Sequence, residues 1–225
     1  IGLFTKELDN ALLEGLADIA VHSAKDLPIE LPSSLKIAGY LPRDSVTDVL
    51  ISRKEAHDIK RIATSSPRRR NQLRSIFPEA EFQLIRGNVG TRLDKILQDE
   101  ADATILAEAG LDRLKISQYK DLVFTNLEHE IMVPAAGQGA IAVVCREDNA
   151  INFKSKLCEI TYEAVSIEKA CLKVLKINFL YIIFCSSLTD QLSNFAKCSI
   201  ICFSSNLGVF PEQASHFWFF KSIFI

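Results

Sequence analysis

The chain has 225 residues, of which 48% are hydrophobic and 24% are charged, and its formal net charge is −2. This composition is ordinary for a globular protein of one or two domains, and the near-neutral charge gives no reason to expect a nucleic-acid or membrane partner. The longest apolar run, near residues 179–184, is far shorter than the roughly 20 residues of a membrane span. No leader-like segment opens the chain. We therefore expect a cytoplasmic protein, with an organelle interior as the alternative.

The cysteines give no sign of a metal site or a disulfide scaffold. There are six, and only Cys145 precedes residue 150. They form neither a CxxC pair nor a Cys/His spacing suited to zinc. We predict no metal ligands.

Composition changes abruptly near residue 177. Every arginine lies between Arg43 and Arg146, whereas nine of the fourteen phenylalanines follow Ile177. Residues 177–225 show neither a helical nor a strand period, and they would leave much apolar surface uncovered. They are either a small Phe-rich subdomain or translated sequence that did not evolve to fold here, such as a frameshift or intron read-through. We favour the second interpretation and treat this segment as an aberrant tail of unknown structure.

The first part of the chain predicts helices alternating with strands. A helix over residues 5–15 has apolar side chains at helical spacing, and Gly15 can end it in a left-handed turn. Short apolar runs then predict strands at 16–23, 36–41 and 47–52.

The next stretch continues this alternation. A strand at 61–66 leads into a helix that begins at Pro67, a residue suited to the first helical position. Further elements are expected at 81–87 (strand), 89–100 (helix), 102–108 (strand) and up to Leu114 (short helix). This order favours a mostly parallel, layered α/β architecture.

Two strand-to-helix junctions combine small residues with arginines. They are TSSPRRR (64–70) and RGNVGTR (86–92). Helix N-termini attract anions, and a guanidinium matches a carboxylate or phosphate bidentately. A solvated basic turn is the alternative for Arg68–Arg70. A nucleic-acid-binding site is a weaker hypothesis, because no aromatic residues lie between the arginines on which bases could stack. A phosphate-binding P-loop is also a weak hypothesis, because the GxxxxGK[ST] motif is absent.

A third polar segment, HSAKDLP (22–28), follows the strand predicted at 16–23. In open α/β sheets, ligands bind beyond the carboxyl ends of strands. A Ser/His/Asp hydrolase is disfavoured, since a triad converges from separate segments and no GxSxG turn occurs. The alternative is a strand-end turn with Lys25 and Asp26 in solvent.

Six segments, in order and at family-like spacing, resemble the signature blocks of the porphobilinogen deaminase (hydroxymethylbilane synthase) family. They are GLFTKEL (2–8), HSAKDLP (22–28), ATSSPRRRNQL (63–73), RGNVGTRL (86–93), LAEAGLDRL (106–114) and PAAGQGAIAV (134–143). The resemblance runs from about Gly2 to about Lys176.

The resemblance implies two type II periplasmic-binding-protein-like α/β domains with a cleft between them, plus the remnant of a small α+β third domain. On this mapping the chain starts inside the first domain, and the crossings near Pro42 and Gly137 act as hinges. The implied domains are 1–41 with 137–156 (first), 42–136 (second) and 157–176 (start of the third).

The family's activity is a transferase reaction of haem biosynthesis. Four molecules of porphobilinogen, each bearing an acetate and a propionate, condense into hydroxymethylbilane with loss of ammonia. The growing chain is built on a dipyrromethane cofactor, joined by a thioether to a cysteine of the third domain. The resemblance also implies a monomer.

Residue by residue, the resemblance makes Asp26 the catalytic carboxylate, with Ser23 and Lys25 binding cofactor carboxylates. Gln138 would lie where the chain recrosses between domains, and His22 is expected to hold the strand-end turn. The residues expected on the second-domain side of the cleft are Thr64, Ser65, Ser66, Arg68, Arg69, Arg86, Asn88, Arg92 and Arg113.

No cysteine matches the family's cofactor attachment. Cys171 lies too early, inside a predicted helix, and Cys185 lies too late, without the flanking glycine. The alternative to an active enzyme is therefore an inactive fragment that at most binds small polycarboxylate or pyrrole ligands.

Overall fold

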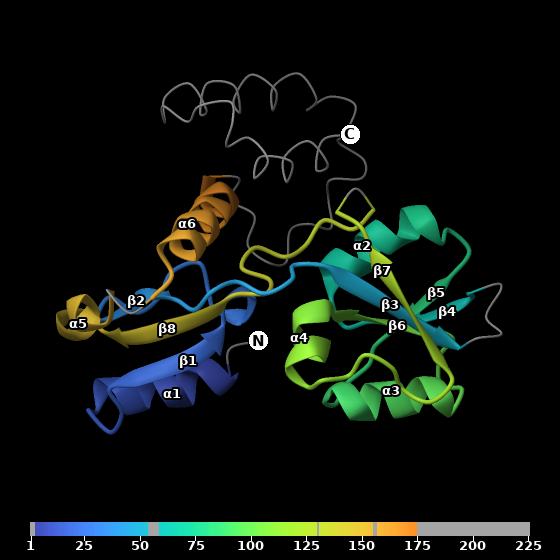
Figure 1. Ribbon diagram of the computed structural model, residues 1–225, viewed down its shortest axis with the longest axis horizontal. Coiled ribbons are helices and arrows are strands. Elements are labelled where there is room, and N and C mark those ends of the chain that lie inside the picture. The colour runs from blue at the N-terminus through green and yellow to red at the C-terminus, as the bar shows by residue number, and fades with distance from the viewer. Residues whose placement is uncertain (1–2, 54–58, 130, 155–156, 175–225) are drawn as a thin grey trace, which may run out of the picture. The chain divides into compact units, whose positions relative to one another are not determined.

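The computed structural model describes residues 3–53, 59–129, 131–154 and 157–174 (Figure 1). These residues belong to two compact units. Unit 1 takes its residues from Ile1–Val46, Ala107–Ser117 and Pro134–Asn178, and unit 2 from Thr47–Leu106 and Gln118–Val133. The mixed α/β class is confirmed. The domain boundaries that the resemblance implies stay a prediction, and the tail at 177–225 lies outside the described residues.

Unit 1 is built on a three-stranded sheet in the order β1-β8-β2. The chain enters it through α1 (Leu3–Leu13), which ends as expected before Gly15 in a left-handed conformation (φ 73°). The strands are β1 (Ile19–Ser23), β2 (Leu35–Tyr40) and β8 (Ile141–Arg146). The other helical elements are η1 (Ala24–Asp26), α4 (Glu108–Arg113), η2 (Glu147–Asn149), α5 (Ala150–Lys154) and α6 (Glu159–Val174).

The expectation of a mostly parallel architecture is wrong for unit 1. Its central strand β8 comes from more than 100 residues further along the chain and pairs antiparallel with both β1 and β2. This strand was not predicted, because local alternation of helices and strands does not reveal a partner that arrives from so far away.

Both faces of this sheet carry buried residues. Side chains alternate along a strand, so Ala142 and Val144 face one side of β8 and Val143 and Cys145 face the other. The first pair joins a core with Leu12 of α1. The second pair packs in a separate cluster that includes part of α5. The sheet thereby holds the end of β1 in a fixed place.

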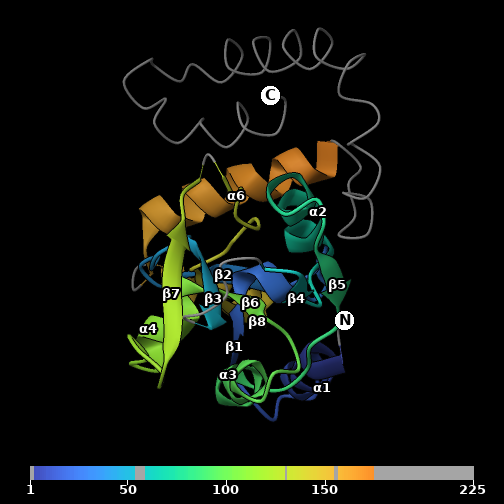
Figure 2. The same cartoon turned by 90° about the vertical axis from the view of Figure 1, so that its right-hand side faces the viewer.

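Unit 2 contains a five-stranded sheet in the order β5-β4-β6-β3-β7. β4 pairs parallel with β5 and β6, and β7 pairs antiparallel with β3. Figures 1 and 2 show α2 and α3 on opposite sides of this sheet. The elements are β3 (Asp48–Arg53), β4 (Arg61–Ala63), α2 (Pro67–Ile76), β5 (Glu81–Gln83), α3 (Val89–Leu97), β6 (Ala103–Ala107) and β7 (Leu122–Leu127).

The parallel pairing of β4 with β5 decides where the two polar junctions lie. Ala63 pairs with Gln83 at the carboxyl ends of the two strands. Each strand then leads into a helix, α2 and α3. Both junctions therefore lie at the same edge of the sheet, the edge at which ligands bind in open α/β folds.

Candidate functional site

The junction after β4 is a capped helix start. Ser66 is the N-cap of α2, and its hydroxyl accepts a hydrogen bond from the Arg69 N–H at 3.4 Å, with Pro67 at the first helical position. Thr64 is buried, and its Oγ1 accepts from the Ser66 N–H at 3.2 Å. Ser65 ties this junction to the next, because its hydroxyl donates to the carbonyl of Ile85 at 2.6 Å.

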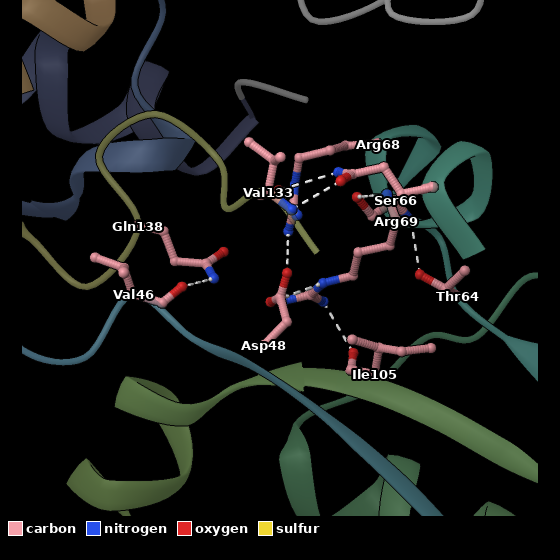
Figure 3. A network of polar contacts seen from close by, with 10 residues as sticks. Val46, Asp48, Thr64, Ser66, Arg68, Arg69, Ile105, Val133 and Gln138 are labelled. Carbon is pink, nitrogen blue, oxygen red and sulfur yellow. Dashed lines mark hydrogen bonds and ion pairs between the residues drawn. The ribbon is translucent and has the colours of Figure 1, made fainter. Parts of the chain in front are cut away.

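The two arginines of this first helical turn do not face solvent. Arg68 and Arg69 are each 8% exposed, and both guanidiniums contact the fully buried carboxylate of Asp48 on β3 (Figure 3). Arg68 Nη2 lies 2.7 Å from Asp48 Oδ2. Arg69 Nε and Nη2 lie 3.1 and 2.7 Å from Asp48 Oδ1. The alternative of a solvated basic turn is therefore wrong for these two residues.

Pairing with the two arginines affects the pKa of the Asp48 carboxylate more than burial does. Burial alone would raise the pKa of Asp48, but the neighbouring guanidiniums of Arg69 and Arg68 hold it below its ordinary value. Burial lowers the pKa of Arg68. Sequence analysis missed Asp48, although a carboxylate inside the apolar run TDVLIS (47–52) was a signal, since buried charges are almost always paired.

The junction after β5 is capped by Asn88. Its Oδ1 accepts hydrogen bonds from the N–H and the hydroxyl of Thr91, at 2.8 and 2.9 Å. Gly87 precedes it at φ 114°, and a Cβ there would come within 2.8 Å of the Thr91 side chain. A glycine is therefore required at this turn.

Arg86 and Arg92 are not paired with a described carboxylate, whereas Arg68 and Arg69 are both paired with Asp48. Within the described residues, neither forms an ion pair, and the one hydrogen bond of Arg92 runs from Nε to the carbonyl of Gly87 at 2.8 Å. Burial lowers the pKa of Arg92, and the nearby positive charge of Arg69 lowers it further. Arg86 is exposed.

In unit 1, the segment HSAKD ends β1 and forms the turn η1. His22 is buried, Ser23 and Lys25 are partly buried, and Asp26 is exposed at the end of the turn. Ala24 anchors the turn by donating its N–H to the carbonyl of Ala140 at 3.0 Å. The Asp26 carboxylate is thus presented to solvent on a turn that the sheet fixes in place.

Gln138 and Arg113 also hold unit 1 together. Gln138 is fully buried and donates from Nε2 to the carbonyl of Val46 at 2.5 Å. Arg113 contacts Asp44 at 2.6 Å and donates to the carbonyl of Gly139 at 2.8 Å. Both side chains therefore tie residues 44–46 to residues 138–139.

A further arginine in this region was not singled out from the sequence. Arg43 pairs bidentately with Glu168 of α6, at 2.6 and 3.0 Å, and donates from Nε to the carbonyl of Gln138 at 2.9 Å. The Glu168 carboxylate also accepts from the Gly137 N–H at 2.8 Å. Helix α6 is thereby joined to residue 43 and to residues 137–138.

The expected site residues accordingly form two sets. Unit 1 holds Ser23, Lys25, Asp26 and Gln138, and also Arg113, which was expected on the second-domain side of the cleft. Unit 2 brings the rest together at the ends of β4 and β5. These are Thr64, Ser65, Ser66, Arg68, Arg69, Arg86, Asn88 and Arg92.

The cysteines in the part of the chain that the structure describes differ in burial and in thiol pKa. Cys145 and Cys171 are buried, and burial raises the pKa of both thiols. Cys158 caps α6, and a hydrogen bond from Thr161 lowers the pKa of its thiol. Cys185 lies outside the described residues. No group of three His, Cys, Asp or Glu residues among those described could hold a metal, and no described helix could cross a membrane.

Comparison with known proteins gives one consistent family. A family model described as "Porphobilinogen deaminase, dipyromethane cofactor binding domain" matches residues 1–153. A probable porphobilinogen deaminase of Methanocaldococcus jannaschii is 45% identical over 175 residues, covering 76% of this chain and 58% of the relative. The porphobilinogen deaminase of Orientia tsutsugamushi is 43% identical over 186 residues, covering 77% and 60%. The chain thus spans about three-fifths of the length of these relatives.

The solved structures that match are more distant in sequence. The periplasmic VFT2 domain of Bordetella pertussis BvgS has a TM-score of 0.43 and 15% identity, covering 74% of this chain and 72% of that one. An ABC transporter protein from Parabacteroides distasonis has a TM-score of 0.42 and 16% identity, covering 97% and 71%.

Proposed function

Since this chain belongs to the porphobilinogen deaminase family, we propose that it acts as a hydroxymethylbilane synthase in tetrapyrrole (haem) biosynthesis. The reaction joins four porphobilinogen molecules head to tail. Each addition forms one carbon–carbon bond and releases one ammonia. The proposed substrate is this small molecule alone, and the proposed state is a monomer in the cytoplasm or an organelle interior.

The observation that carries this proposal is the pair Arg86 and Arg92 at the edge of the unit 2 sheet. Both lie beside the start of α3, where backbone N–H groups and the helix dipole already favour an anion. Neither is neutralised by a carboxylate among the described residues. A substrate that bears an acetate and a propionate on each pyrrole supplies the missing negative charge.

Asp26 is proposed as the catalytic carboxylate. It is exposed on the rigid turn that ends β1, so a pyrrole N–H can reach it. A carboxylate held there stabilises positive charge that develops on the ring nitrogen, and such preorganised electrostatics lower the barrier to reaction. Lys25 and Ser23, on the same segment, are proposed to bind carboxylates.

The donor set of the described residues suits a dipyrromethane cofactor, because its acetate and propionate groups need cationic partners. Arg86 and Arg92, both in unit 2, would hold these carboxylates. When bound, the cofactor supplies the pyrrole carbon onto which the first substrate is added. Of the described cysteines, Cys145 and Cys171 are buried and Cys158 is partly buried, and none of the three matches the family's attachment residue.

The missing sequence match to the family's attachment cysteine is the ground for a second candidate function. The chain would then be an inactive fragment that at most binds small polycarboxylate or pyrrole ligands.

A turnover assay separates the two functions. Purified protein is incubated with porphobilinogen, the product is oxidised to uroporphyrin, and its absorbance is compared with that of an Asp26→Asn variant. We expect porphyrin from the wild-type chain and at least tenfold less from the variant. Porphyrin at equal levels would remove Asp26 from the chemistry. No porphyrin from folded wild-type protein would leave only the binding fragment.

A further inference from the structure

We propose that Arg70, near the start of α2, is a further binding residue of the anion site in unit 2, and that it favours ligands of more than one pyrrole. It contacts a carboxylate beyond those that Arg86 and Arg92 hold. The identity of the ligand rests on the proposed function. The placement of Arg70 rests on the structure of unit 2 alone.

Helix α2 carries four arginines, and they differ in their partners. Arg68 and Arg69 are paired with a carboxylate, and Arg74 lies over an aromatic ring. The side chain of Arg70 forms no ion pair or hydrogen bond with the residues that the structure describes, although its Nε atom is buried. A buried donor without an acceptor is uncommon and costs free energy, and an anionic ligand would supply the acceptor.

Helix geometry places the Arg70 side chain at the start of α2, on the side that faces β5. The Arg70 N–H donates to the carbonyl of the N-cap residue Ser66 at 3.0 Å, and helical side chains lean toward the N-terminus. Arg74 lies one turn later on the same side, and its guanidinium is 6.0 Å from the centroid of the Phe82 ring in β5. Arg70 is therefore directed toward the carboxyl end of β5.

The carboxyl end of β5 leads into the segment that holds Arg86. Ser65, just before α2, fastens this segment to the helix start. Its hydroxyl donates to the carbonyl of Ile85 at 2.6 Å and accepts from the Ile85 N–H at 3.2 Å. Arg86 is the next residue, and its side chain is exposed. Arg70 thus lies beside the anion site, on its β5 side.

The number of unpaired arginines indicates the size of the ligand. One porphobilinogen carries two carboxylates, and Arg86 and Arg92 supply two guanidiniums, each of which can bind a carboxylate through two hydrogen bonds. A third guanidinium finds an anionic partner only in a ligand with at least two pyrroles. The proposed reaction builds such a chain, so Arg70 strengthens binding of the growing chain relative to that of a single substrate molecule.

Calorimetric titration with two ligands tests this preference. The probes are porphobilinogen and uroporphyrin I, a stable tetrapyrrole that carries an acetate and a propionate on each ring. At low salt, Arg70→Ala in the full chain should weaken uroporphyrin binding about tenfold and porphobilinogen binding less than about twofold, because only the larger ligand reaches the third guanidinium. Arg70→Lys should retain part of the affinity, since it keeps the charge but loses the bidentate contact.

Arg74→Ala is the matched control, because it removes the same charge from the same helix one turn further from the site. It should leave both affinities within about twofold of the wild-type values. Equal losses of uroporphyrin affinity in Arg70→Ala and Arg74→Ala would reveal a general effect of charge and overturn the proposal. An unchanged uroporphyrin affinity in folded Arg70→Ala, or equal losses for both ligands, would overturn it as well.

Chemical protection gives a second measurement on the unaltered chain. Phenylglyoxal modification is followed at each arginine by peptide mass spectrometry. Uroporphyrin should slow the reaction at Arg70, porphobilinogen should slow it at Arg86 and Arg92 only, and neither should protect Arg74. If the chain binds both ligands while Arg70 stays unprotected, this proposal alone is wrong. If the folded chain binds neither ligand, the proposed function fails together with it.

Discussion

Four arginines of unit 2 lie at or beside the starts of α2 and α3, and they fall into two classes. Arg68 and Arg69 share the buried carboxylate of Asp48. Arg86 and Arg92 have no carboxylate partner among the described residues. Pairing therefore decides which of these side chains holds the fold and which is available to an anion.

Asp48→Asn should destabilise unit 2 by about 3–5 kcal/mol at neutral pH, because two buried guanidiniums would lose their counter-charge. The folded-state pKa of Asp48 is lowered. Its contribution is therefore present above the unfolded pKa of about 3.9 and is lost as the pH falls through the folded-state value. Urea unfolding at several pH values should show the gap between wild type and variant closing on acidification. A gap that stays constant down to acid pH would contradict the pairing.

Gly139 sets a second residue-level constraint. Its φ is 79°, and a Cβ would come within 2.5 and 2.6 Å of the carbonyl oxygens of Asp44 and Ser45. Gly139→Ala should therefore lower the free energy of unfolding of unit 1 by about 1–3 kcal/mol. Gly110→Ala is the control, since a Cβ there meets nothing within 4 Å. Equal stability of the two variants in urea titrations would be evidence against the close approach of Gly139 to the carbonyls of Asp44 and Ser45.

Among the helices and strands, local signals in the sequence predicted several elements well. Pro67 marked the start of α2, and Gly15 marked the end of the first helix, because a first helical position and a left-handed turn depend on adjacent residues. Helix α3 begins at Val89 as expected and ends at Leu97, three residues early. The strand expected at 81–87 is shorter, ending at Gln83.

Features that depend on distant partners could not be predicted in this way. The placement of β8 between β1 and β2, and the burial of Arg68 and Arg69 on Asp48, join segments far apart in the chain. Three adjacent arginines suggest a solvated turn when their neighbours alone are considered. Only the register of β3 in the sheet brings Asp48 to them.

The two helix caps at the site should differ in strength. Asn88 Oδ1 accepts from Thr91 N–H at 2.8 Å, whereas the corresponding contact of Ser66 is 3.4 Å long. Asn88→Ala should therefore destabilise unit 2 by about 1 kcal/mol, and Ser66→Ala by less. Asn88→Asp, which keeps the cap, should retain stability in the same urea titration. A larger loss for Ser66→Ala than for Asn88→Ala would contradict these geometries.

For the molecule as a whole, the family and the chemistry of the site point to the same class of ligand. The family match covers residues 1–153, which include both Asp26 and the arginines of unit 2. The anchor for the cofactor is the part that the described residues do not provide. Binding of carboxylated pyrroles is thus the property on which both candidate functions agree.

Calorimetric titration of porphobilinogen into the purified chain tests that property most directly. At low salt we predict saturable binding that weakens as ionic strength rises, since the contacts are charge-assisted. Arg86→Ala or Arg92→Ala should weaken it about tenfold, whereas Arg74→Ala, on the far part of α2, should bind as the wild type does. A folded chain that binds no porphobilinogen, or that binds it equally well without Arg86 and Arg92, would contradict the account.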